Sequence, residues 1–210
     1  MRSFKSAFPQ DVLGPLQDGV MRYTYKGTPC LKCPLDMAIY LKLLWDLKPR
    51  TIIEVGSKYG GSAVFMADTA QTFGLNAHVY SIDLETPDIV DERITFLQGD
   101  VNHLDKTFAP HGLSDCPHPW FITEDSAHTY AGCMAALHVF AAEMHKGDML
   151  AMEDGILDEL GISERYEGGP NRAIAEFLAA HPDSFELDTE LCDMFGTNAT
   201  HSPNGYMHKT

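Results

Sequence analysis

The chain has 210 residues, which is long enough for one α/β domain with a sizeable core, and its 44% hydrophobic content is that of an ordinary globular protein. Its net charge of −15 disfavours a nucleic-acid substrate, because such a field repels phosphate groups. The sequence has no apolar run that could span a membrane, no secretory leader, and an odd number of cysteines (five), so we expect a cytoplasmic protein without a membrane partner.

Residues 1–34 are predicted to form an irregular N-terminal arm or lid, ahead of one domain over residues 35–210. Prolines and glycines punctuate this stretch, and the aromatic residues between them make it too apolar for a solvated tail. The arm could shape a pocket, form an oligomer contact or only pack on the domain. Cys30 and Cys33 form a Cys-x-x-Cys pair, for which structural zinc, a redox pair and reduced thiols all stay open.

The rest of the chain alternates between predicted helices and predicted strands. Apolar spacing predicts helices over residues 36–47, 62–73, 101–108, 129–145 and 170–180. Short apolar runs predict strands over residues 51–55, 77–82, 94–97, 119–122, 149–152, 185–187 and 206–208. This alternation indicates an α/β fold with a parallel sheet and helices on both faces, whose ligands bind outside the carboxyl ends of the strands.

A glycine turn follows the first of these strands and precedes a helix. The segment from Thr51 to Ser62 reads Thr-Ile-Ile-Glu-Val-Gly-Ser-Lys-Tyr-Gly-Gly-Ser, a device that can hold a nucleotide-like ligand. Asp83 ends the next strand, where a carboxylate can accept both ribose hydroxyls and would repel the extra phosphate of NADP. The turn lacks the third glycine of a dinucleotide site and the Lys of a Walker loop, so S-adenosylmethionine is the favoured cofactor.

Acidic residues end the successive strands, and they would lie along one edge of the sheet: Glu54, Asp83, Asp100, Asp125, Glu153 and Asp154. Each could instead be an ordinary turn residue or helix cap. Asp125, Glu153 and Asp154 together offer oxygen ligands that suit Mg²⁺ or another hard divalent cation. His128 follows Asp125 by three residues and could act as a general base beside the metal, although most histidines are surface or cap residues.

Four stretches together resemble the cephalosporin hydroxylase family. They are residues 27–36, residues 48–62, the segment Asp-Ser-Ala-His-Thr at 125–129, and the Glu-Asp pair at 153–154. Residues 169–178 and 203–208 also resemble the family's C-terminal pattern, so the likeness covers about residues 21–209. Members of this family look like class I S-adenosylmethionine-dependent methyltransferases, and they are related to rhamnosyl and macrolide-sugar O-methyltransferases.

The resemblance implies a Rossmann-like, seven-stranded sheet whose last strand is antiparallel. It implies that Asp125, Glu153 and Asp154 bind Mg²⁺ and that His128 is the base. The cofactor residues that we predict on the turn and the strand ends are Glu54, Gly56, Ser57, Tyr59, Gly60, Gly61, Ser62, Asp83 and Asp100. The sequence departs from the family pattern at Ala127, Glu124 and Gly155, which leaves the acceptor open.

The predicted function is Mg²⁺-dependent O-methylation of a hydroxyl on a small natural-product or sugar-like molecule. One alternative keeps the cofactor but catalyses a non-methylating cyclisation, elimination or lyase reaction. Another is a non-catalytic partner in a biosynthetic pathway. The predicted partners are a small-molecule acceptor and further copies of the chain in a homo-oligomer, with no nucleic acid.

Overall fold

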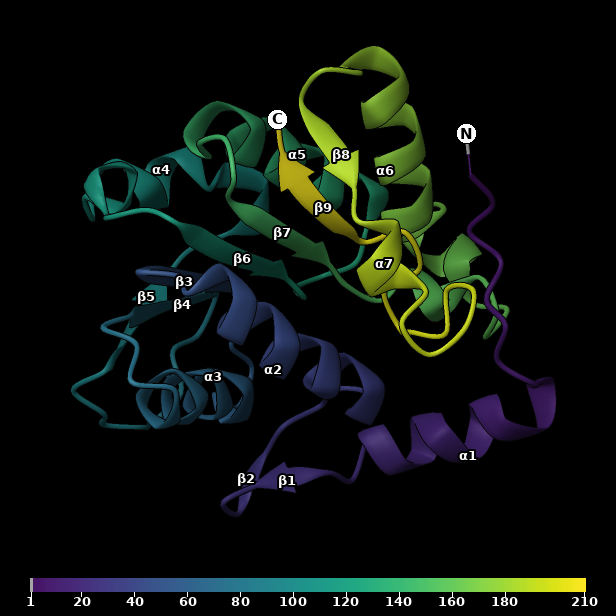
Figure 1. The fold of residues 1–210 in the computed structure, drawn as a ribbon, viewed down its shortest axis with the longest axis horizontal. Helices are drawn as coiled ribbons and strands as arrows, with labels where there is room; N and C mark the ends of the chain where they lie inside the picture. Colours follow the sequence, from purple (N-terminus) through teal and green to yellow (C-terminus); the bar gives the residue numbers. More distant parts are fainter. Residues whose placement is uncertain (1) are drawn as a thin grey trace.

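Seven strands form one sheet in the computed structural model, which describes residues 2–210 (Figure 1). The strand order across this sheet is β5-β4-β3-β6-β7-β9-β8. The bounds are Thr51–Val55 for β3, His78–Asp83 for β4, Ile94–Gln98 for β5, Trp120–Glu124 for β6, Met149–Met152 for β7, Phe185–Leu187 for β8 and Tyr206–Lys209 for β9. β3 to β7 pair in parallel, and β9 runs antiparallel to both β7 and β8, which confirms the predicted seven-stranded, mostly parallel sheet.

Helices cover both faces of the sheet (Figure 1). Their bounds are Pro34–Leu47 for α2, Gly61–Thr72 for α3, Asp105–Phe108 for α4, Tyr130–Glu143 for α5, Gly169–Ala180 for α6 and Thr189–Cys192 for α7. α2, α3 and α7 share one hydrophobic core with the sheet, and α4, α5 and α6 share another on the opposite face. The central strands β3, β6 and β7 are therefore buried along their whole length, as their continuous apolar runs predict.

The first 34 residues are not irregular, which corrects the prediction from sequence. Helix α1 covers Gln10–Val20, and a small hairpin pairs β1, Thr24–Tyr25, with β2, Thr28–Pro29. The helix contains Pro15 and two glycines, the residues that disfavour a helix interior, so local propensity gives no sign of it. It is held instead by burying Leu13 and Val20. The division into an arm and a domain stays a prediction.

Short single-turn elements complete the chain between the long ones. The 3-10 turns are η1 at Val101–His103, η2 at Leu113–Asp115, η3 at Gly155–Leu157 and η4 at Ser163–Tyr166. η3 and η4 shape residues 155–169, which sequence patterns treat as a plain loop. Within residues 2–210, no helix is both long and apolar enough to cross a membrane.

Candidate active site

A cavity of about 330 Å³ opens where the carboxyl ends of the strands meet the N-terminal segment. Its wall combines the turn after β3, the residues that follow β6 and β7, helix α1 and the segment before α2. These pieces are far apart in the sequence, and the parallel sheet brings them together because the strands end at the same edge. This cavity contains most of the residues that the sequence singles out.

The glycine turn packs directly against the end of β6. Gly56 has φ of +107°, and a Cβ atom on it would lie 2.1 Å from the backbone oxygen of Asp125. Gly56 N–H donates to the oxygen of Ile82, and Asp125 N–H donates to the oxygen of Val55, at 2.8 Å each. Only glycine fits this conformation and this approach. The turn thus stays open toward the cavity, as a cradle for a cofactor requires.

Glu54 supports the turn from behind. Its side chain is fully buried, and it accepts hydrogen bonds from the hydroxyls of Ser62 and Ser81. Ser57 Oγ lies 2.6 Å from Ser81 Oγ, which ties the same turn to β4. Burial raises the pKa of Glu54, and the nearby Lys32 opposes that shift. Glu54 is not among the residues that line the cavity, so its place in the structure is that of a brace for the turn.

The remaining turn residues divide between the cavity and the packing beneath it. Ser57, Tyr59 and Ser62 line the cavity, and Tyr59 is half exposed. Gly60 has φ of +80°, and a Cβ there would approach the side chain of Ile89 to 2.7 Å. A Cβ on Gly61 would lie 2.2 Å from the backbone oxygen of Pro29. Gly60 therefore leaves room for the segment after β4, and Gly61 lets the N-terminal segment cross close over the start of α3.

A second cavity of about 420 Å³ adjoins the first at Gly56, Lys58, Asp125 and Ser126, and it contains the two predicted nucleoside contacts. Asp83 accepts hydrogen bonds from the backbone N–H groups of Lys58 and Leu84, at 2.7 Å each. Asp100 accepts from Asn102 N–H at 2.9 Å, and this contact lowers its pKa. Each carboxylate keeps acceptor capacity for a ligand.

Asp125, His128 and Asp154 come together at the junction of β6 and β7. Each offers one ligand atom, and these atoms all lie within 4.8 Å of one another. β6 and β7 pair in parallel, so their ends meet as predicted. His128 and Asp154 have φ of +55° and +59°, a left-handed conformation that turns both residues out of their strand direction. Among residues 2–210, this is the one such set of metal-type ligands.

The two nitrogens of the His128 ring have different surroundings. Nε2 of His128 lies 3.2 Å from Oδ2 of Asp154, and Nδ1 is buried without a hydrogen-bond partner. His128 therefore approaches Asp154 through Nε2, and Nδ1 is the ring nitrogen without a partner in the protein. His128 also lines the cavity. The ring thus stands beside Asp154 in the wall of the cavity.

Glu153 points to a different set of partners from those of Asp154. Its Oε1 accepts from Nζ of Lys32 at 2.6 Å and from the hydroxyl of Tyr40 at 2.5 Å. The same Nζ lies 2.5 Å from Oδ2 of Asp125. Burial alone would lower the pKa of Lys32, but Asp125 and Glu153 together hold it well above its usual range. The ammonium therefore stays charged between the two carboxylates.

Glu124, the extra acid beside Asp125, faces the protein interior. It is fully buried and accepts from the hydroxyl and the N–H of Ser126. Burial raises its pKa, although Ser126 opposes that shift. Cys133 of α5 lies behind it at 3.6 Å. Glu124 is therefore a packing residue beneath the site.

Four residues of the site escape the sequence patterns: Gln17, Lys32, Tyr40 and His201. Lys32 lies between the two cysteines of the Cys-x-x-Cys pair, and that motif suggests a role for the cysteines and none for the lysine. Gln17 belongs to the helix that sequence patterns miss. Oε1 of Gln17 and Nε2 of His201 are both buried without partners, and both residues line the cavity. No local spacing could connect these residues to the strand ends, because only the tertiary fold does so.

Comparison with solved structures places the fold among class I methyltransferases. A CmcI structure described as holding Mg and SAM matches 90% of this chain and 77% of its own, with 28% identity and a TM-score of 0.71. An apo CmcI structure matches all of this chain and 88% of its own, with 26% identity and a TM-score of 0.73. The methyltransferase MycE shares the fold at 17% identity and a TM-score of 0.52, over 71% of this chain and 41% of its own.

Comparison with characterised sequences gives the same result. A rhamnosyl O-methyltransferase of Mycobacterium leprae (strain TN) is 28% identical over 192 residues, which cover 88% of this chain and 82% of that protein. The corresponding protein of Mycobacterium tuberculosis (strain ATCC 25618 / H37Rv) is 27% identical over 88% of this chain and 77% of its own length. The family described as Rhamnosyl O-methyltransferase/CmcI matches residues 18–210. The chain belongs to this family, which confirms the resemblance seen in the sequence.

Proposed function

We propose that this chain is an S-adenosylmethionine-dependent O-methyltransferase that methylates a hydroxyl of a sugar or sugar-bearing natural product with the help of Mg²⁺. One observation supports this most directly: the glycine turn and the Asp125–His128–Asp154 set line the same cavity. A methyl donor in the turn would therefore lie beside the groups that can bind and deprotonate an acceptor. The family and the names of the relatives agree with this assignment.

The residues present fit the cofactor. Asp83 and Asp100, in the adjoining cavity, would accept hydrogen bonds from the ribose and adenine parts. Gly56 leaves the space that a Cβ would otherwise fill, and Ser57 and Ser62 line the passage toward the first cavity. The surrounding carboxylates favour a ligand that carries a positive sulfonium group. Orientation of this group toward the acceptor would supply much of the rate enhancement.

The residues present also fit a hard divalent cation. Asp125 and Asp154 place carboxylate oxygens close together beyond the carboxyl ends of β6 and β7, and Mg²⁺ prefers oxygen ligands. Glu153 is the third predicted ligand, and its Oε1 is already bound to Lys32 and Tyr40. When bound, the cation would lower the pKa of an acceptor hydroxyl.

His128 would take the proton from that hydroxyl. Its Nδ1 has no partner in the protein, and its Nε2 is held by Asp154, so the ring cannot easily rotate away. Tyr166 of η4 packs edge-on against the ring at 6.0 Å between centroids and limits its movement further. We expect removal of this base to lower methyl transfer by about 10²- to 10⁴-fold.

The acceptor would enter between α1 and residues 155–169. Apolar residues of the N-terminal segment and of residues 155–169 both line the cavity: Val20, Met21, Leu157, Leu160 and Ile162. These apolar residues would exclude water from the reacting groups, while Gln17 and His201 add polar side chains to the same lining. A wall of this composition suits a sugar ring with one polar and one apolar face.

The test is an incubation of the purified chain with S-adenosylmethionine, Mg²⁺ and a panel of 6-deoxyhexosides that includes methyl α-L-rhamnoside. Mass spectrometry should find S-adenosylhomocysteine and a methylated product in equal amounts. His128→Gln should bind the cofactor normally in calorimetry and lose turnover. Lys42→Met, far from the cavity, is the matched control and should change neither.

Two results would contradict the proposal. Failure of the chain to bind S-adenosylmethionine would exclude the cofactor. Conversion of an acceptor without S-adenosylhomocysteine would favour a non-methylating reaction on the same scaffold. Homo-oligomer formation and the cytoplasmic location stay predictions, which light scattering and cell fractionation would test.

A further inference from the structure

The Cys-x-x-Cys segment, residues 30–33, places Lys32 beside the carboxylates of Asp125 and Glu153. Burial raises the pKa of Cys30 and of Cys33 to about 12, so both thiols stay protonated and serve as apolar anchors. Lys32 N–H donates to the oxygen of Cys30 at 2.8 Å, and α2 begins at Pro34. Both cysteines are buried beside a side chain that reaches past them. The pair therefore fixes the path along which Lys32 enters the site.

Lys32 is one of the most deeply buried charges in the protein. Its side chain is 3% exposed, and its Nζ lies 2.5 Å from Oδ2 of Asp125 and 2.6 Å from Oε1 of Glu153. Tyr40 donates to the same oxygen of Glu153 at 2.5 Å. A buried ammonium needs such partners, because removing its charge from water is strongly unfavourable unless carboxylates compensate for the lost hydration. An apolar side chain could anchor this segment, so anchoring alone does not require a charged residue at position 32.

The two carboxylates that hold Lys32 are also two of the three predicted metal ligands. Asp125 belongs to the set that gathers with His128 and Asp154, and Glu153 precedes Asp154 in the chain. A cation and an ammonium that share carboxylates repel each other strongly in a buried site. Lys32 takes up acceptor capacity of Asp125 Oδ2 and Glu153 Oε1, so a metal bound by these carboxylates would lie beside the ammonium while the lysine remains in place.

We propose that Lys32 is an internal cation that competes with the divalent metal for Asp125 and Glu153. The proposal rests on the metal site of the proposed function. Without the metal, the ammonium neutralises the carboxylates and ties the N-terminal segment to the ends of β6 and β7. When the metal binds, Lys32 withdraws from these oxygens. Lys32 is therefore a positioning residue that reduces metal affinity and holds Asp125 and Glu153 in place.

The first experiment measures Mg²⁺ affinity by calorimetry on the full chain with S-adenosylhomocysteine present. Lys32→Met removes the competing charge and keeps most of the side-chain volume. It should bind Mg²⁺ about tenfold more tightly than the wild type, because a like charge next to the metal is gone. Lys42→Met is the matched control, since it removes one positive charge from an exposed helix pair with Asp46. It should leave the affinity unchanged.

Thermal unfolding separates this role from a merely structural one. In EDTA, Lys32→Met should have a lower Tm than the wild type, because Asp125 and Glu153 lose their partner. Saturating Mg²⁺ should raise the Tm of the variant more than that of the wild type. A lysine that only anchored the segment would lower the Tm equally with and without Mg²⁺ and would not tighten metal binding.

A third measurement uses the wild type and does not depend on a variant that folds. Reductive methylation followed by mass spectrometry reports how accessible each lysine is. Mg²⁺ should increase the modification of Lys32 severalfold and leave exposed Lys42 unchanged. Equal or lower modification of Lys32 with Mg²⁺, or Mg²⁺ affinity in Lys32→Met that is no tighter than in the wild type, overturns the proposal.

The outcomes also separate this proposal from the proposed function. A wild type that transfers methyl groups, with Lys32→Met binding Mg²⁺ no more tightly, overturns only the role of Lys32. Tighter Mg²⁺ binding by the variant, without methyl transfer by the wild type to any acceptor, supports the role of Lys32 and counts against the reaction. If neither protein binds Mg²⁺, the competition fails even where methyl transfer is found.

Discussion

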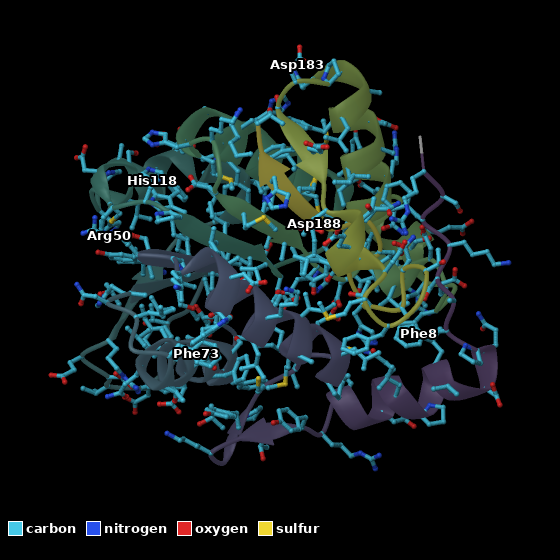
Figure 2. The ribbon with its side chains drawn as sticks, viewed as in Figure 1. Phe8, Arg50, Phe73, His118, Asp183 and Asp188 are labelled. Atoms are coloured by element: carbon cyan, nitrogen blue, oxygen red, sulfur yellow. The ribbon has the colours of Figure 1, made fainter. Side chains whose placement is uncertain are left out.

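Strands β6 and β7 have buried acidic groups at both of their ends, and the two ends differ in how these groups are paired. Where the strands begin, Asp148 accepts from Trp120 N–H at 2.8 Å, from His145 N–H at 2.7 Å and from His118 Nδ1 at 2.8 Å. Figure 2 shows His118 at this left-hand edge, with Arg50 of the neighbouring segment before β3. Each oxygen of Asp148 is occupied by a backbone N–H, which needs no flexible side chain.

Where the strands end, the carboxylates have few backbone donors. Glu153 and Asp125 share one lysine, and within residues 2–210 the ring of His128 is the only ion-pair partner of Asp154. Backbone donors make the first end a closed structural site, whereas side-chain donors leave the second end able to exchange partners. An acidic residue near a strand end is therefore a candidate for a functional role when its partners are side chains, and for a structural role when they are backbone N–H groups.

The largest effect that would test this comparison is expected for Asp154→Asn. Asparagine tolerates the left-handed backbone at this position, so the fold should be kept while the charge is lost. Methyl transfer should fall by at least about 10³-fold, because both the metal site and the orientation of His128 depend on this carboxylate. Steady-state assays of S-adenosylhomocysteine release would measure it. Activity within tenfold of the wild type would place the active centre elsewhere.

Asp148→Asn is the reciprocal change at the other end. An amide cannot accept all three hydrogen bonds, so a buried donor would be left without a partner. We expect the free energy of unfolding to fall by about 3 kcal/mol. Urea denaturation would measure this loss, and kcat of the folded protein should stay within about twofold. A variant that is fully stable but inactive would reverse the roles given to the two ends.

The increase in stability that bound Mg²⁺ produces should also distinguish the two ends of the strands. Mg²⁺ at about 100 times its Kd should raise the free energy of unfolding by about 2.7 kcal/mol, because it binds the native state alone. The increase should persist in Asp148→Asn and disappear in Asp154→Asn, and EDTA should abolish it in both the wild type and Asp148→Asn. An equal increase in all three proteins would indicate binding outside the Asp125–His128–Asp154 set.

The smallest effect is expected at a third group of ion pairs, which lies outside both strand ends. Arg93 contacts Asp91 at 2.5 Å and Asp68 at 2.9 Å, and its hydrogen bonds lower the pKa of Asp91 to about 2. Because this pKa is lower in the folded protein than in the unfolded chain, ionised Asp91 stabilises the fold at pH values above its ordinary pKa of about 4. This contribution disappears as the pH falls toward about 2. Arg93→Met should cost about 0.5 kcal/mol at neutral pH. Urea unfolding at pH 7 and pH 2.5 would test whether the loss shrinks in acid.

The sheet could be predicted well because its strands are buried runs bounded by turns and acids. β3 and β7 were expected at 51–55 and 149–152, which is where they lie. α1 could not be predicted, because Pro15 and its glycines oppose a helix that only tertiary contacts stabilise. The single turns η3 and η4 also depend on packing against α6, which local sequence does not encode.

The candidate site could be predicted where its residues lie close in the chain. Asp125 and His128 are three residues apart, and Asp154 ends the neighbouring strand, so topology alone brings them together. Lys32 is 93 residues from Asp125, and its role depends on the path of the N-terminal segment. Glu54 was expected to contact the cofactor, and the structure places it behind the turn with Ser62 and Ser81. Its contact with the cofactor stays a prediction.

The contact of Gly56 with the backbone of Asp125 has a consequence for how such an enzyme can change. The cofactor turn and the acidic strand end are in direct backbone contact, so neither can shift without the other. We therefore expect new acceptor preferences to arise from α1 and residues 155–169, which line the cavity from separate parts of the chain. Exchange of these two segments between relatives would transfer acceptor choice and leave the methyl-donating half intact.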